Sequence, residues 1–138
     1  MMGALDWKRR RLIITTSRTK RSSDFIALLE ELDQLYGPRP GVQTKPVVIV
    51  LDNGPIHTSK ATRKALAARA HWLTVEWLPK YAPELNDIEI VWRDLKAHHL
   101  AHQTFANTET IDIAIHRAVA AVNSKRNRHP WDKSRISA

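Results

Sequence analysis

Two acidic residues in this sequence stand where carboxylates can bind divalent metal ions, Asp52 and Glu89. Asp52 directly follows the apolar run Val-Val-Ile-Val-Leu at residues 47–51, and Glu89 closes the stretch Asn-Asp-Ile-Glu at residues 86–89. Mg²⁺ and Mn²⁺ favour carboxylate ligands, and substrate oxygens complete their coordination. Two such ions about 4 Å apart can activate an attacking water or hydroxyl and stabilise the oxygen that leaves a phosphodiester. Phosphodiester cleavage is therefore one chemistry that this pair of carboxylates could serve.

Each carboxylate also has a structural interpretation that the local sequence leaves open. Asp52 could end its strand in an Asx-turn with Asn53. Asn86 and Glu89 have the spacing of a capping box at a helix start, and Asp87 suits the positive end of the helix dipole. Spacing alone does not decide between these interpretations and a metal site.

The elements around these residues predict that both carboxylates follow the ends of core strands. An unbroken apolar run such as residues 47–51 is typical of a parallel core strand. Residues 72–78 are rich in β-branched and aromatic side chains and predict a second strand. A helix over residues 60–70, capped by Thr58 or Ser59, fits the crossover between them. Ligands of open α/β sheets bind beyond the carboxyl ends of the strands, where Asp52 and the loop toward Glu89 are expected.

The remaining chain predicts an α/β layer with a mixed sheet. Residues 2–7 and 12–16 form a predicted hairpin around a basic tip, and a helix runs from Ser22 to near Gly37. Downstream, one helix is expected to turn Ile88, Val91, Trp92 and Leu95 inward, and another spans Thr108 to about Asn123. The basic segment 123–138 is expected to be a flexible tail.

Composition favours a polyanionic partner. The chain has 138 residues, enough for one domain, and 22 lysines and arginines against 14 acidic residues give a formal charge of +8. Nucleic acid is the first partner that this charge suggests, and an anionic membrane surface is the second. Without cysteine there is no disulfide framework or Cys-based zinc site. No apolar run approaches a membrane span, so we expect a cytoplasmic protein.

Two segments, VVIVLDNGPIH at residues 47–57 and LPKYAPELNDIEIVWRDLK at residues 78–96, resemble the paired signature of DDE-type transposases. The resemblance is to the insertion-sequence branch related to the Tc/mariner elements. It extends over roughly residues 1–122, and two linked motifs in the right order are more specific than either alone. The resemblance implies an RNase H-like fold and the cutting and joining of DNA at transposon ends. It also implies two Mg²⁺ or Mn²⁺ ions held by three acidic residues.

Carried over to this sequence, the resemblance implies that Asp52 is the second catalytic acid and Glu89 the third. Residues 53–88 separate the two, an interval that resembles the spacing of the family. Asn53, His57 and Asn86 are then expected near the site. His57 is placed beside the metal or the DNA without a proton-transfer role, and a helix-start histidine bonded to backbone is the alternative. Asp87 departs from the usual proline, but aspartate is also favourable at a helix start.

The first catalytic Asp of the family lies on a strand upstream of the hairpin, and we expect this chain to lack it. Asp6 is a weaker candidate to replace it, because it matches a hairpin-turn residue better. Residues 1–122 are therefore interpreted as a partial catalytic domain without its first strand. An upstream-frame polypeptide could supply the missing Asp and a helix-turn-helix region, and a homodimer is expected for the complete form.

Basic residues near the predicted site are expected to contact phosphates if DNA is the substrate, although solvated surface charge is the alternative. They are Lys8, Arg9, Arg10, Arg11, Arg18, Lys20, Arg21, Lys80, Arg93 and Lys96. His98 and His102 have the spacing of a zinc pair, but we expect them to face solvent. Trp72, Trp77 and Trp92 are expected in the core.

Two alternative functions remain at this point. One is a catalytically inactive nucleic-acid-binding remnant or regulator. The other is a small stand-alone RNase H-like nuclease, which would need Asp6 or another carboxylate close to Asp52 and Glu89.

Overall fold

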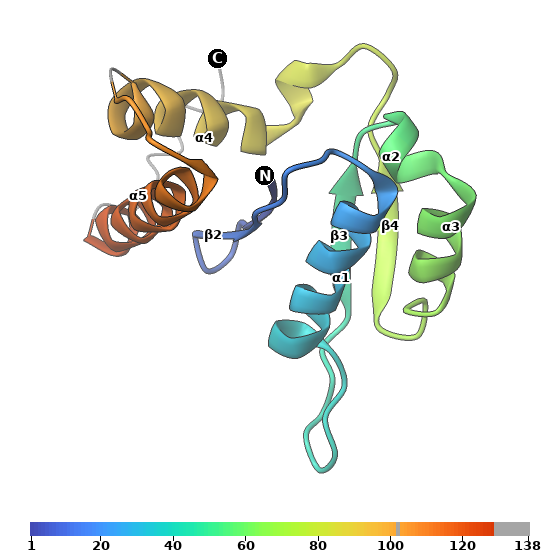
Figure 1. Ribbon diagram of the computed structural model, residues 1–138. Coiled ribbons are helices and arrows are strands. Elements are labelled where there is room, and N and C mark those ends of the chain that lie inside the picture. The colour runs from blue at the N-terminus through green and yellow to red at the C-terminus, as the bar shows by residue number, and fades with distance from the viewer. Residues whose placement is uncertain (102, 129–138) are drawn as a thin grey trace. The chain divides into compact units, whose positions relative to one another are not determined.

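A computed structural model describes residues 1–101 and 103–128, and the chain divides into two units (Figure 1). The first unit comprises residues 1–2 and 15–86, and the second comprises residues 3–14 and the chain from Asp87 onward. Asp52 belongs to the first unit and Glu89 to the second. No helix in the described ranges is long and apolar enough to cross a membrane.

Two parallel strands form the centre of the first unit. β3 (Val47–Leu51) pairs with β4 (Leu73–Trp77), with Val47 opposite Leu73 and Leu51 opposite Trp77. The short helix α2 (Pro55–Thr58) and α3 (Lys60–Ala67) make the connection between the strands, so the predicted strand–helix–strand crossover is confirmed. Figure 1 shows α2 at the arrowhead end of β3, the end at which parallel α/β sheets bind ligands.

Helix α1 (Ser22–Tyr36) supplies much of the first unit's core and packs against α3. Its apolar residues recur at helical spacing, and four of them are buried: Phe25, Leu28, Leu29 and Leu32. Asp33 accepts a two-pronged contact from the Arg69 guanidinium, with Nε–Oδ1 and Nη2–Oδ2 distances of 2.8 and 2.6 Å. This ion pair ties α1 to the turn that follows α3.

The junction between α2 and α3 is fixed by hydroxyl groups. The Ser59 Oγ accepts a hydrogen bond from the Thr62 N–H at 3.2 Å, so Ser59 rather than Thr58 caps α3. The fully buried Thr62 donates its hydroxyl to the Ile56 carbonyl at 2.5 Å. A polar side chain this deep in the core is therefore hydrogen-bonded, and its bond holds α2 against the start of α3.

The second unit packs a hairpin with two helical segments. The hairpin comprises β1 (Met2–Asp6) and β2 (Arg11–Thr15), which lie almost entirely in this unit. α4 (Asp87–Leu95) continues into a π-helical stretch, η2 (Lys96–Leu100), and α5 spans Thr108–Arg128. Its buried apolar residues come from β2, α4 and α5: Leu12, Ile13, Val91, Leu95, Ala118, Val119 and Val122.

One side-chain amide joins α5 to the hairpin. The Leu12 N–H donates to the Asn123 Oδ1 at 2.7 Å, and the Asn123 Nδ2 donates back to the Leu12 carbonyl at 2.9 Å. A glutamine or asparagine amide can satisfy both backbone groups of one strand residue in this way. Asn123 therefore pairs with β2 as a neighbouring strand would.

Three expectations from the sequence need adjustment. The described strands form two separate two-stranded sheets, β1–β2 and β3–β4, where one mixed sheet was expected. α5 continues to Arg128, past its expected end near Asn123. Trp77 is 42% exposed, whereas Trp72 is buried as predicted. The expected tail beyond Arg128 lies outside the described residues.

Replacing Asn123 with alanine is expected to lower the free energy of unfolding by about 1–3 kcal/mol, because it leaves the part-buried N–H and carbonyl of Leu12 without partners. Urea denaturation measures the change. Ser124→Ala, at the neighbouring exposed position of α5, is the matched control and should change stability by less than about 0.5 kcal/mol. Equal effects from both substitutions would contradict a specific role for Asn123.

Candidate functional site

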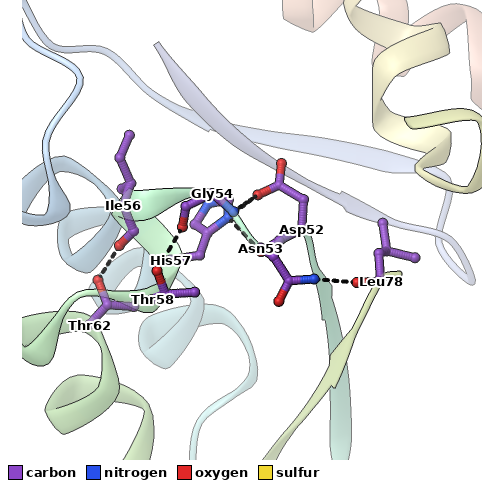
Figure 2. Close-up of polar contacts among 8 residues, drawn as sticks. All are labelled: Asp52, Asn53, Gly54, Ile56, His57, Thr58, Thr62 and Leu78. Carbon is purple, nitrogen blue, oxygen red and sulfur yellow. Dashed lines mark hydrogen bonds and ion pairs between the residues drawn. The ribbon is translucent and has the colours of Figure 1, made fainter. Parts of the chain in front are cut away.

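Asp52 leaves the carboxyl end of β3 with one carboxylate oxygen bonded and the other turned outward (Figure 2). Its Oδ1 accepts hydrogen bonds from the Gly54 N–H at 2.8 Å and from the His57 Nδ1 at 2.7 Å. Figure 2 shows the second oxygen pointing away from the labelled residues. The side chain is 52% exposed. An Asx-type turn is thus present, and it leaves an oxygen available for a ligand.

The surroundings of Asp52 keep its carboxyl group ionised. Partial burial on its own would raise the pKa, but the Gly54 N–H and the His57 side chain stabilise the charged form through hydrogen bonds. The positive charges of His57 and Lys20 act in the same direction. The net result is a pKa for Asp52 below its ordinary value of 3.8. At neutral pH the group is an anion, as a cation ligand must be.

Gly54 is the residue that allows the turn to close on the carboxylate. A Cβ at this position would lie 2.9 Å from the Asp52 Oδ1, closer than ordinary van der Waals contact. Any larger residue would therefore displace the carboxylate from its two hydrogen bonds. The backbone φ of Gly54, −62°, is accessible to every residue. The preference for glycine here therefore comes from the short distance to the Asp52 carboxylate.

His57 is held between Asp52 and the core of the first unit. Its ring lies against the Phe25 ring of α1 with a centroid separation of 4.6 Å and an interplanar angle of 60°. The side chain is only 20% exposed, and its backbone N–H donates to the Gly54 carbonyl at 2.9 Å. His57 therefore lies beside Asp52, and its place near a metal or DNA stays a prediction. The histidine bonds the catalytic candidate's side chain as well as backbone, with a longer 3.3 Å contact to the Asp52 carbonyl.

Asn53 ties the carboxyl ends of the two strands together. Its Nδ2 donates to the Leu78 carbonyl, and the Leu78 N–H donates to the Leu51 carbonyl at 2.8 Å. Leu78 begins the loop that contains the second motif. Asn53 therefore fixes where that loop leaves the sheet, a positioning contact that spans residues 53 to 78.

Glu89 is the third residue of α4 and is exposed. Asn86 directly precedes α4, at the place expected for a cap. Among the hydrogen bonds of the described residues, none joins Asn86 and Glu89 as a capping box would require. Because Asp52 and Glu89 belong to different units, a shared site for them remains a prediction. Within residues 1–101 and 103–128, no group of three or more acidic or histidine side chains could hold a metal by itself.

Among the first unit's basic residues that are predicted to contact DNA, Lys20 acts electrostatically on Asp52. Arg18, Lys20 and Arg21 are exposed and belong to the loop before α1, and the charge of Lys20 reaches Asp52. Asp24 fixes this loop, since its carboxylate accepts hydrogen bonds from the Ser17 and Thr19 hydroxyls at 2.7 and 2.8 Å and from the Arg21 N–H at 2.7 Å. The loop's cations are thus held on an ordered backbone.

Lys80 is exposed in the loop after β4, beside Tyr81. Tyr81 is 99% exposed and has a positive φ of 60°, a strained value for a residue with a side chain. Strained residues cluster at functional loops, so this position is compatible with contact to a ligand.

The second unit's basic residues that are predicted to contact DNA lie at the hairpin tip and on the α4–η2 segment. The hairpin tip contains Lys8, Arg9, Arg10 and Arg11, and Asp6 closes the turn by accepting the Arg9 N–H at 2.9 Å. This contact supports the interpretation of Asp6 as a turn residue. Arg93 of α4 and Lys96 of η2 are exposed.

The histidine pair expected to face solvent is only partly described. His98 is 72% exposed on its side chain and lies 3.5 Å from the Asp94 carboxylate, one helical turn earlier. His102 lies outside the described residues.

Three features of the site had no signal strong enough to be found from sequence. The roles of Gly54 and Asn53 depend on how close other groups approach, and the loop anchored by Asp24 depends on hydroxyls at positions 17 and 19. Only the capping spacing of Arg21 and Asp24 could have suggested the last of these.

Asp24 provides a pH-dependent test of the ordered loop. Hydrogen bonds from Ser17, Arg21 and Thr19 lower the pKa of its carboxyl below 3.8. Because the native pKa is depressed, the stabilisation is fully present above the unfolded pKa and is lost as pH falls through the native value. NMR titration of the carboxyl carbons should therefore place Asp24 below 3.8 in the wild type, and Ser17→Ala should move it upward. An Asp24 pKa unchanged by Ser17→Ala would contradict the hydrogen-bonded loop.

Comparison with known proteins shows the family and the fold. A family model described as DDE superfamily endonuclease matches residues 1–112. A comparison with curated proteins gave no match. Among solved structures, a chain of the simian T-cell lymphotropic virus intasome in complex with the PP2A regulatory subunit B56 gamma is similar. The TM-score is 0.59 at 19% identity, over 85% of this chain and 39% of that one. At this identity the likeness shows the fold alone, and the predicted RNase H-like α/β fold is confirmed.

Proposed function

This chain belongs to the DDE superfamily of endonucleases, and we propose that it is part of a transposase catalytic domain that cleaves DNA and transfers strands at transposon ends. The main support is the Asp52 carboxylate at the carboxyl end of β3. It is ionised, held through one oxygen and exposed through the other, inside the region that matches the family. The insertion-sequence branch related to Tc/mariner is the family branch that we propose.

Mg²⁺ or Mn²⁺ fits the groups present at Asp52. Hard divalent cations bind ionised carboxylates, and the outward oxygen of Asp52 offers such a ligand. We propose Glu89 as the second protein ligand, because its exposed carboxylate at the start of α4 follows the second motif. Ions bound there would activate the attacking water or hydroxyl and stabilise the leaving oxygen.

The remaining residues of the site serve the metal ligands and the DNA in this proposal. Asn53 holds the start of the second-motif loop through Leu78, and Asn86 introduces α4. Phosphate contacts are assigned to the basic residues on the hairpin tip, on the loop before α1, and at Lys80, Arg93 and Lys96. These contacts position DNA without reading its sequence.

The complete enzyme needs a third carboxylate in this proposal. Asp6 bonds its own hairpin turn, and the described chain contains no cluster of three metal-binding side chains. We propose that residues 1–122 form a partial catalytic domain, with the third acidic residue supplied by an upstream-frame polypeptide. A homodimer on the transposon ends, acting on chromosomal DNA in the cytoplasm, completes the proposal. The structural neighbour is likewise longer, since this chain matches 39% of it.

A plasmid-nicking assay with Mn²⁺ tests the proposal. The chain alone should nick no more than its Asp52→Ala variant, because two carboxylates leave the ions incompletely bound. With the upstream polypeptide added, nicking should appear, and Asp52→Ala or Glu89→Ala should lower its rate by at least about 100-fold. Strong nicking by the chain alone that Asp52→Ala abolishes would contradict the need for a third carboxylate. Nicking that survives both substitutions would contradict the assigned site.

Salt dependence tests the DNA contacts separately. Lys20→Ala and Arg21→Ala should each weaken binding of duplex DNA and lower the salt slope of log K by about 1, since each removes one phosphate contact. Lys64→Ala, an exposed lysine on α3 outside the proposed contacts, is the matched control and should leave the slope unchanged. If all three substitutions have the same small effect, the two loop residues are solvated charges.

A further inference from the structure

The two oxygens of the Asp52 carboxylate differ in their surroundings. Oδ1 already accepts two hydrogen bonds, from the Gly54 N–H at 2.8 Å and the His57 Nδ1 at 2.7 Å. The other oxygen points away from both donors (Figure 2). A carboxylate oxygen with two donors in place has little capacity left for a cation.

We propose that His57 is a positioning residue that holds Oδ1, so that Asp52 presents only Oδ2 to a divalent cation. This inference rests on the proposed metal site and adds a coordination mode to it. Mg²⁺ demands near-ideal octahedral geometry, so a ligand limited to one oxygen in a fixed direction suits it better than a freely rotating carboxylate.

The rigidity of His57 supports this role. The Phe25 ring, 2% exposed in the core of α1, lies against the imidazole, and the His57 N–H is bonded to the Gly54 carbonyl. The ring is therefore fixed by α1 and α2 before any ligand arrives. Hydrogen-bond partners that orient a metal ligand in this way typically contribute 10- to 100-fold in metal affinity, as an order of magnitude.

The Gly54 N–H is the second donor that holds Oδ1 of Asp52. It donates to Oδ1 at 2.8 Å, and the Cβ of a larger residue would crowd that oxygen at 2.9 Å. Both donors therefore converge on the same oxygen, and rotation of the carboxylate would break two bonds at once.

The histidine tautomer gives a readout that does not involve metal. Because Nδ1 donates to Asp52, His57 has a proton on Nδ1 in both forms, and Nε2 is bare in the neutral form alone. Long-range ¹H–¹⁵N NMR of the full chain should show this pattern for His57, and Asp52→Asn should change it. An Nε2–H tautomer in the wild type would overturn the proposal.

Mn²⁺ titration of the full chain, followed by paramagnetic broadening of the Gly54 amide signal, tests the effect on the metal. His57→Leu should weaken Mn²⁺ binding by roughly 10- to 100-fold. His57→Asn, whose side-chain amide can still donate toward Oδ1, should recover binding to within about 3-fold of wild type. His71→Leu, an exposed histidine after α3, is the matched control and should change nothing. The amide spectrum of each variant reports whether it folds.

The outcomes distinguish failure of the metal site at Asp52 from failure of the positioning role of His57. If Asp52→Asn removes the broadening but His57→Leu does not weaken it, His57 is not a positioning residue and the metal site stands. If Asp52→Asn leaves the broadening intact, or the wild type shows none, the metal site itself is wrong. Failure of His57→Asn to restore binding in a folded variant would show that the hydrogen bond is not what His57 contributes.

Discussion

The parallel pairing of β3 and β4 is the constraint on which the first unit's site depends. It places Leu51 opposite Trp77, so both strands end at one edge, and the Leu78 N–H extends the pairing to the Leu51 carbonyl. The crossover through α2 and α3 then has to start at Asp52, which puts the acid, the turn and the histidine at that edge. Asn53 adds a bond from this turn to Leu78. The position of the Asp52 carboxylate at this edge thus follows from the register of the two strands.

Three polar side chains of the first unit are each hydrogen-bonded to groups close to them in the sequence. Oδ1 of Asp52 is bonded by the turn that it begins, Thr62 is bonded by the preceding short helix, and Asp24 is bonded by the loop that leads into α1. Each bond orders a segment that carries a candidate functional group. The hydrogen bonds from Gly54 and His57 lower the pKa of Asp52, since they stabilise its ionised form.

Periodicity and composition were enough to predict most elements, because helices and strands repeat their apolar residues at their own spacing. α1 begins at Ser22 and ends at Tyr36, next to the predicted stop at Gly37. Contacts between distant residues could not be predicted in this way. Nothing near Asn123 in the sequence indicates that its amide pairs with the backbone of Leu12. Trp77 is 42% exposed although the sequence places it in the core, so burial of each strand residue could not be predicted from composition.

In the candidate site, too, the motifs predict which residues matter, whereas the contacts between them could not be predicted. The motifs predict Asp52 and Glu89 as site residues, and Asp52 directly follows β3 as expected. The bond from His57 to one particular carboxylate oxygen depends on turn geometry and on the contact with Phe25, the fourth residue of α1. The spacing of residues in the sequence does not specify either one. The role of Gly54 likewise depends on a close approach in space.

We propose that Asp52 and Glu89 bind the same metal site. A double-mutant cycle on Mn²⁺ affinity, with Asp52→Asn, Glu89→Gln and the pair combined, tests this proposal. Two ligands of one site are coupled, so we expect each single substitution to weaken binding and the double variant to be weakened by much less than the two effects added. Strictly additive effects, or a Glu89→Gln variant that binds Mn²⁺ like the wild type, would contradict it.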